Sequence, residues 1–133
     1  MTREEKDLVL HDLCARLPYR VIGEYSWKGN EPYNRELTGS LFDELKSSWD
    51  STEDSEFLPY LRPMSSMTEE EKKEYQSLCV IHSDHDADDN VTYYYFDTVE
   101  SFDYLNKNMF DYRGLIDKDL ALSTEIYNPY YKD

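Results

Sequence analysis

A run of 33 consecutive residues between Lys73 and Lys107 contains no lysine or arginine. Five tyrosines lie in this run together with eight acids, which are Glu74, Asp84, Asp86, Asp88, Asp89, Asp97, Glu100 and Asp103. A solvating tail carries few aromatic residues, so this mixture favours a folded surface with a strong negative potential. The fold must therefore present these carboxylates to solvent and also accommodate the tyrosine rings.

The whole chain has 133 residues and a formal net charge of −15. DNA, RNA and anionic membranes select basic surfaces, so direct binding to nucleic acid or membrane is not expected. A basic protein is the favoured partner.

Cys14 and Cys79 are too few for a disulfide scaffold, and the sequence shows neither a signal peptide nor an uncharged span of membrane length. Both thiols are expected to be reduced, and the protein cytoplasmic.

The first half of the chain predicts a helix, a hairpin and a loop. Thr2 and Glu5 have the spacing of a capping box, and Pro18 ends the helix they open. Its apolar stripe is Val9, Leu10, Leu13, Cys14 and Leu17. Turn-forming residues at 28–32 divide the aromatic and β-branched runs between 19 and 42, which predicts a hairpin. Residues 46–56 are polar and predict an exposed acidic loop.

The second half predicts two helices and one strand. Ser65, Ser66 or Thr68 can cap a helix that ends near Cys79. An exposed acidic loop follows at 82–90, and then a central or paired strand at 91–96 with aromatic residues on both faces. The sequence thus indicates one domain over 1–133, of the α+β class, with three helices packed on a small, mainly antiparallel sheet.

The last predicted helix runs from Asp97 or Thr98 to about Met109 and has two contrasting sides. At 100° per residue, one side carries Val99, Phe102, Leu105 and Met109 and is expected to face the core. The opposite side carries Asp97, Glu100, Asp103 and Tyr104 with no compensating base. We interpret this acidic side as the candidate partner-binding surface, supported by Asp84, Asp86, Asp88 and Asp89.

Alternate acids at Asp84, Asp86 and Asp88 resemble the first half of a calcium-binding loop. Asp89 stands where that loop needs glycine, and Tyr95 stands where it needs a bidentate glutamate. The pattern therefore favours a solvated acidic loop, and we expect no metal and no cofactor.

His11 and Cys14 are three residues apart on a predicted helix, a spacing at which a thiolate could meet its base. Cys14 nevertheless falls on the apolar stripe, where an ordinary buried thiol is expected. The sequence contains no serine elbow, phosphate-binding glycine loop or zinc motif. The prediction is that this protein is not an enzyme.

A family resemblance is carried by three parts of the sequence, at 2–8 with 12–19, at 60–73, and at 110–116 with 120–122. In these parts the chain resembles an uncharacterised family of small acidic proteins carried by phages and mobile elements of gut anaerobic bacteria. The resemblance covers about a third of the chain and implies no activity. Relatives have glycine where this chain has Arg20 and Asp119, so a turn with positive φ would be strained here. Arg62 and Arg113, rare bases in the shared parts, are expected to anchor carboxylates or helix ends.

Small acidic phage proteins often inhibit host restriction or CRISPR machinery, and by analogy the resemblance favours such a role. The leading hypothesis is an accessory protein that binds a basic, nucleic-acid-binding protein as a DNA mimic. The alternative is a plain protein-interaction or assembly module, such as a homodimer joined through tyrosines, in which charge provides only solubility.

Overall fold

The computed structural model describes residues 1–51 and 55–130 and has the α+β class that the sequence predicts. Four α-helices are present, one more than predicted. The helices are α1 (Arg3–Arg16), α2 (Gly39–Asp50), α3 (Glu69–Leu78) and α4 (Val99–Lys107), with short 3-10 turns η1 (Met64–Ser66) and η2 (Ile116–Lys118). The strands are β1 (Ile22–Trp27), β2 (Tyr33–Glu36), β3 (Ser55–Leu61), β4 (Val80–His85), β5 (Val91–Phe96) and β6 (Leu122–Ser123).

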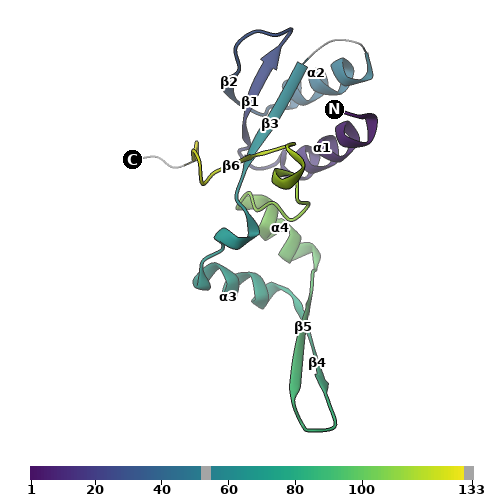
Figure 1. Cartoon of the computed structure of the whole chain (residues 1–133), viewed down its shortest axis with the longest axis vertical. Coiled ribbons are helices and arrows are strands. Elements are labelled where there is room, and N and C mark those ends of the chain that lie inside the picture. Colours follow the sequence, from purple (N-terminus) through teal and green to yellow (C-terminus); the bar gives the residue numbers. More distant parts are fainter. Residues whose placement is uncertain (52–54, 131–133) are drawn as a thin grey trace.

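Four of the strands form one sheet in the order β2-β1-β3-β6 (Figure 1). β1 pairs antiparallel with both β2 and β3, and β6 adds to β3 in parallel. The hairpin predicted between 19 and 42 is present, but its second strand ends at Glu36 because Thr38 caps the next helix. Val21, Phe57 and Leu61 belong to the core beside this sheet.

Helix α1 begins at the predicted capping box, in which Thr2 and Glu5 bond each other's backbone N–H groups. Its buried residues are Val9, Asp12, Leu13 and Arg16. The predicted stripe was therefore partly wrong, since Cys14 is exposed and Arg16 is fully buried. Arg16 can lie inside because it pairs with Asp12 one turn earlier.

Helix α2 was missed, because residues 46–50 continue a helix where the sequence analysis placed a loop. Leu41, Leu45 and Trp49 recur at four-residue intervals and are all buried. The indole N–H of Trp49 donates to the backbone carbonyl of Ser55, the first residue of β3. The predicted loop at 46–56 is therefore corrected to a helix end and a strand start, while its residues 52–54 lie outside the described residues.

The rare arginines anchor carboxylates, as predicted. Arg62 donates to both oxygens of Glu71, at 2.6 and 2.7 Å, and its guanidinium lies 4.2 Å from the ring centroid of Phe110. Arg113 donates to Asp12 at 2.8 Å. These contacts fix the segment after β3 to α3 and the segment after α4 to α1.

The two positions at which the resemblance leads us to expect glycine, Arg20 and Asp119, differ in conformation. Asp119 adopts the left-handed region, with φ 59°, directly after η2. Arg20 has no positive φ and instead pairs with Glu36 at the surface. A short polar side chain tolerates the left-handed region better than most others, so Asp119 retains the turn at a modest cost.

The strand at 91–96 is present and is paired, which is one of the two predicted alternatives, but it is not central and does not belong to the main sheet, which holds the hairpin. β5 pairs only with β4, in a separate two-stranded antiparallel ribbon from Val80↔Phe96 to His85↔Val91. Helices α3 and α4 lie between this ribbon and the main sheet, and the ribbon projects from them as a narrow extension (Figure 1). Within the described ranges, no helix combines the length and apolar character needed to cross a bilayer.

Candidate functional site

The β4–β5 ribbon, which we call the arm (residues 80–96), exposes every side chain of both strands. Large apolar or aromatic residues make up much of it, namely Val80, Ile81, Val91, Tyr93, Tyr94, Tyr95 and Phe96. Tyr93 is 60% exposed and Phe96 is 56% exposed. Isolated apolar residues are common on surfaces, but a contiguous apolar patch marks an interaction site.

Alternation along the two strands gives the arm two faces. One face carries Ile81, Ser83, His85, Val91, Tyr93 and Tyr95, and we call it the Tyr93 face. The other carries Val80, His82, Asp84, Thr92, Tyr94 and Phe96, and we call it the Phe96 face. The His82 and Phe96 rings make an edge contact on the second face, at 6.5 Å between centroids. Neither face has another layer of the chain packed over it, since all these residues are exposed.

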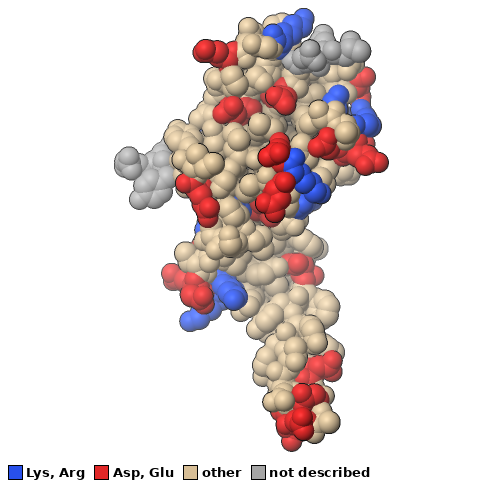
Figure 2. Space-filling view, in the orientation of Figure 1, with Lys and Arg blue, Asp and Glu red and all other residues tan. Residues whose placement is uncertain are grey.

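The turn at 86–90 closes the arm and gathers acids at its far end, where red side chains cluster in Figure 2. Asp86 holds this turn together, because its carboxylate accepts the backbone N–H groups of Asp88 and Asn90 at 2.8 and 2.9 Å. These bonds, with that from Asn90 first, lower the pKa of Asp86. Asp86 is thus a turn-forming residue, and Asp84, Asp88 and Asp89 present the remaining negative charge of the tip.

The near end of the arm is fixed to α3. Thr98, which caps α4, donates its hydroxyl to the backbone carbonyl of Leu78 at 2.7 Å. Tyr75 donates to the carboxylate of Asp97, the residue that follows β5. Burial first and this contact second raise the pKa of Tyr75. The arm therefore leaves the body from a fixed base, although its outer part has no support.

The acidic side predicted for α4 is divided by the structure. Asp97 accepts from Tyr75 and Ser101, so its carboxylate serves the junction of α3 and α4. Tyr104 donates to Glu74 at 3.2 Å, and burial followed by the charge of that carboxylate raises the pKa of Tyr104 to about 12. Glu100 and Asp103 stay exposed on the helix, and neither forms a hydrogen bond or ion pair within residues 1–51 and 55–130.

The predicted core side of α4 was also partly wrong. Leu105 and Met109 are buried as expected, whereas Val99 is 76% exposed and Phe102 is 41% exposed. The helix turns Ser101 into the interior instead, where its hydroxyl completes the capping box of Thr98. Val99 and Phe102 are thus further exposed apolar residues on the first turns of α4, and the Phe102 ring lies 5.4 Å from that of Tyr112.

The other sequence-derived candidates do not assemble into a chemical site. Among residues 1–51 and 55–130, no group of three or more histidine, cysteine or acidic side chains is placed to hold a metal ion. Cys14 is exposed and lines a shallow hollow with His11 and Phe42. That exposure contradicts the buried thiol expected from the apolar stripe, because the buried face of α1 is rotated toward Asp12 and Arg16.

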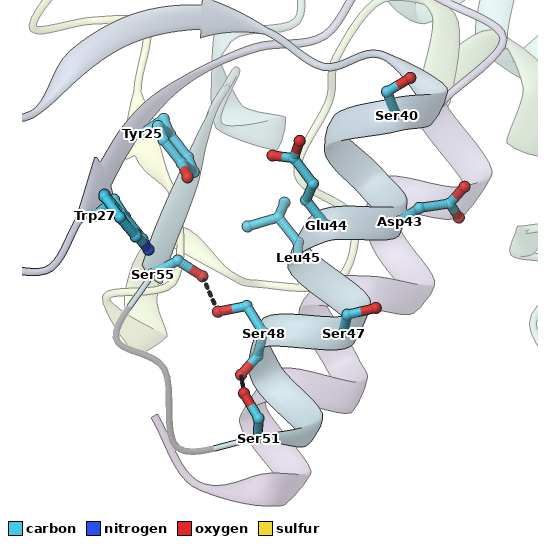
Figure 3. Close-up of a pocket in the computed structure, with 10 residues that line it drawn as sticks. All are labelled: Tyr25, Trp27, Ser40, Asp43, Glu44, Leu45, Ser47, Ser48, Ser51 and Ser55. Carbon is cyan, nitrogen blue, oxygen red and sulfur yellow. Dashed lines mark hydrogen bonds between the residues drawn. The ribbon is translucent and has the colours of Figure 1, made fainter.

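A hollow of about 590 Å³ lies between β1 and α2 (Figure 3). Tyr25 and Trp27 form its wall on the strand side, and Asp43 and Glu44 lie on the helix side among several serines. Ser48 and Ser55 hydrogen-bond across its lower end, at 2.6 Å. Among the described residues that line it there is no histidine, cysteine, lysine or arginine, so these residues offer carboxylates and hydroxyls but no nucleophile paired with a nitrogen base.

The acidic loop predicted at 82–90 is corrected, because residues 82–85 belong to strand β4 and only 86–90 form the exposed turn. The sequence analysis also missed the exposed apolar side chains of the arm. The signal was present in β4, where His82, Ser83 and Asp84 follow Val80 and Ile81. A polar strand beside an aromatic one cannot continue a buried sheet.

Comparison of the chain with protein-family models, curated proteins and solved structures gave no match.

Proposed function

We propose that this chain is a non-enzymatic interaction protein that binds a basic protein partner through its arm. The observation that carries the proposal is the exposure of the arm's aromatic and aliphatic side chains along both strands. Such a ribbon is marginally stable alone and leaves apolar surface in water. Binding a partner removes that surface from water, which favours association at about 25 cal/mol per Å² of apolar area.

Charge selects the class of partner. The arm and the adjoining helix carry no lysine or arginine from residue 74 to residue 106. Asp84, Asp88 and Asp89 at the tip would attract lysine and arginine side chains and repel another acidic surface. A second copy of this chain brings its own net charge of −15, so charge disfavours self-association through the tip.

A nucleic-acid-binding protein is the basic partner that we infer, because its phosphate-binding lysines and arginines would accept the carboxylates of the tip. The arm would then occlude the surface that holds nucleic acid. In this proposal the protein acts in the cytoplasm as an accessory protein of a phage or mobile element, and its partner belongs to the host defence.

The test is a pull-down from host lysate with wild-type protein and two charge variants of equal net charge. The tip variant carries Asp84→Lys with Asp88→Lys, which spares the turn-forming Asp86. The matched control carries Glu100→Lys with Asp103→Lys on α4. We expect a nucleic-acid-binding protein to be retained by wild type and by the control, lost from the tip variant, and displaced by excess double-stranded DNA.

Equal retention by both variants would contradict the role of the tip. If DNA does not displace the partner, the protein still binds a protein partner, but it does not compete with nucleic acid. Sedimentation equilibrium of the purified protein tests the alternative of a homodimeric assembly module. A dimer that persists in both charge variants would replace the proposal of a basic partner.

A further inference from the structure

We propose that the outer edge of β5 accepts an extended segment of the partner as a third strand of the arm. This inference rests on the proposed function and specifies how the partner is held. Two-stranded ribbons have two open edges, and addition of a strand to an open edge is a common mode of peptide recognition. The edge of β5 differs from the two edges of the main sheet, at β2 and β6.

The edges of the main sheet carry the features that usually block strand addition. β2 has only four residues, follows Pro32, and includes Arg35 and Glu36. β6 has only two residues. Short strands, proline and charged side chains are the devices by which natural sheets prevent edge pairing.

The arm lacks these devices. Each of its strands has six residues, and neither contains proline, lysine or arginine. Their register is unbroken over six pairs, so no bulge turns an edge away. β5 also consists wholly of β-branched and aromatic residues, which favour strand pairing, whereas β4 includes His82, Ser83 and Asp84.

The direction of the backbone groups of β5 follows from the ladder. The backbone N–H of Asp86 donates to the carbonyl of Asn90 at 3.0 Å, which makes these residues a hydrogen-bonded pair. Hydrogen-bonded and open pairs alternate in antiparallel sheets, so Tyr93, opposite Ser83, belongs to an open pair. Val91, Tyr93 and Tyr95 therefore direct their N–H and C=O groups to the outer edge of β5.

The occupant is an extended basic segment. Along β5 it would meet rings and β-branched side chains on both faces, which suit apolar or β-branched cross-strand neighbours. At the tip it would meet Asp88 and Asp89, which suit lysine or arginine. Alternating valine and lysine is the simplest sequence with both properties, and we use it as the probe.

The experiment measures binding of a fluorescent peptide of five Lys-Val repeats by anisotropy at physiological salt. Tyr93→Pro removes one outward N–H but leaves the ladder with β4 intact, because that N–H is not used there. Tyr93→Ala removes the same ring and keeps the N–H, so it is the matched control. We expect Tyr93→Pro to weaken binding at least tenfold more than Tyr93→Ala.

A peptide of five Lys-Gly repeats has the same charge and a poor strand propensity, and we expect it to bind at least tenfold more weakly than the probe. Equal binding of the two peptides, equal effects of Pro and Ala, or no binding of the probe would overturn strand addition. A different experiment tests the proposed function. It would be contradicted if the tip variant kept its partner from the lysate, whatever the Tyr93 variants do. Circular dichroism of each variant verifies that the body remains folded.

Discussion

The Arg16 guanidinium donates to both carboxylate oxygens of Asp12 in the interior, at 2.9 and 3.1 Å, one helical turn apart on α1. Both side chains are fully buried. Arg16 also donates to the backbone carbonyl of Phe110 at 2.7 Å, and Arg113 donates to Asp12 from the other side. This network ties the first helix to the segment that follows α4, 94 residues later.

Asp12→Asn is expected to lower the free energy of unfolding by about 3 to 5 kcal/mol, because it leaves the Arg16 charge buried without its partner. Urea unfolding followed by circular dichroism measures the loss. Asp7→Asn on the same helix is the matched control, since Asp7 pairs with Arg3 at the exposed surface. That change should cost less than about 0.5 kcal/mol, and a similar cost for both would contradict the structural role of the network.

The ion pair of Arg62 and Glu71 predicts a dependence of stability on pH. Two hydrogen bonds from Arg62 are the main cause that lowers the pKa of Glu71 from its ordinary value of 4.5 to about 2. A carboxyl whose folded pKa is depressed stabilises the fold above its unfolded pKa and loses that contribution as the pH falls. The contribution of Glu71 should therefore be complete at neutral pH and disappear between about pH 4.5 and 2.

Glu71→Gln is expected to cost about 1 kcal/mol at pH 7, a value that allows for solvent screening of this partly exposed pair. Glutamine retains the capping box with Thr68, so the change isolates the charge. The difference from wild type in urea unfolding should shrink as the pH approaches 2. Glu70→Gln on the same turn is the control, and a cost for Glu71→Gln that does not change with pH would contradict the assignment.

Local signals in the sequence predicted the helix ends better than they predicted the sheet. The capping box of Thr2 and the end of α3 near Cys79 lie where the sequence placed them, and Thr68 is the one of three candidate residues that caps α3, because capping depends on residues within one turn. Strand β3 was missed because its first residues were assigned to the loop at 46–56, and because proline is uncommon inside strands, whereas Pro59 lies opposite Gly23 in the sheet. Which strands pair is decided by contacts distant in sequence, and no short pattern reports them.

The candidate site shows the same division between local and distant information. The acids of the tip were predicted to be exposed, and they are, because carboxylates with no basic partner stay in solvent. The strand that carries Tyr93 and Tyr95 was expected in the same sheet as the 19–42 hairpin, with aromatic residues on both faces, because its residues favour strands. The exposure of the two rings depends on where α3 and α4 place the ribbon, which propensity cannot indicate.

Gly23 is predicted to tolerate no side chain. A Cβ added there would lie 2.5 Å from Cζ of Phe57 and 2.8 Å from the backbone oxygen of Leu58, so the strand or the core must shift. Gly23→Ala is expected to cost about 1 to 3 kcal/mol in urea unfolding, as overpacked cores do. Gly39→Ala is the control, because nothing lies within 4 Å of a Cβ at that position at the start of α2. It should be neutral or slightly stabilising, and equal effects at the two positions would refute the close contact.

The arm is expected to contribute little to the stability of the body. Tyr95 is exposed on the arm, whereas Leu105 is 1% exposed at the interior side of α4. Leu105→Ala should lower the free energy of unfolding by about 2 to 5 kcal/mol. Tyr95→Ala should change it by less than about 1 kcal/mol, because surface substitutions have small effects.

Thermal and urea unfolding of these two variants, at protein concentrations that differ tenfold, measure both effects and detect self-association. A large cost for Tyr95→Ala that is independent of concentration would mean that the arm packs against the body in solution. A cost that appears only at high concentration would mean that arms of two copies bury Tyr95 against each other. A small cost at both concentrations leaves the rings of the arm available, which binding of a partner through the arm requires.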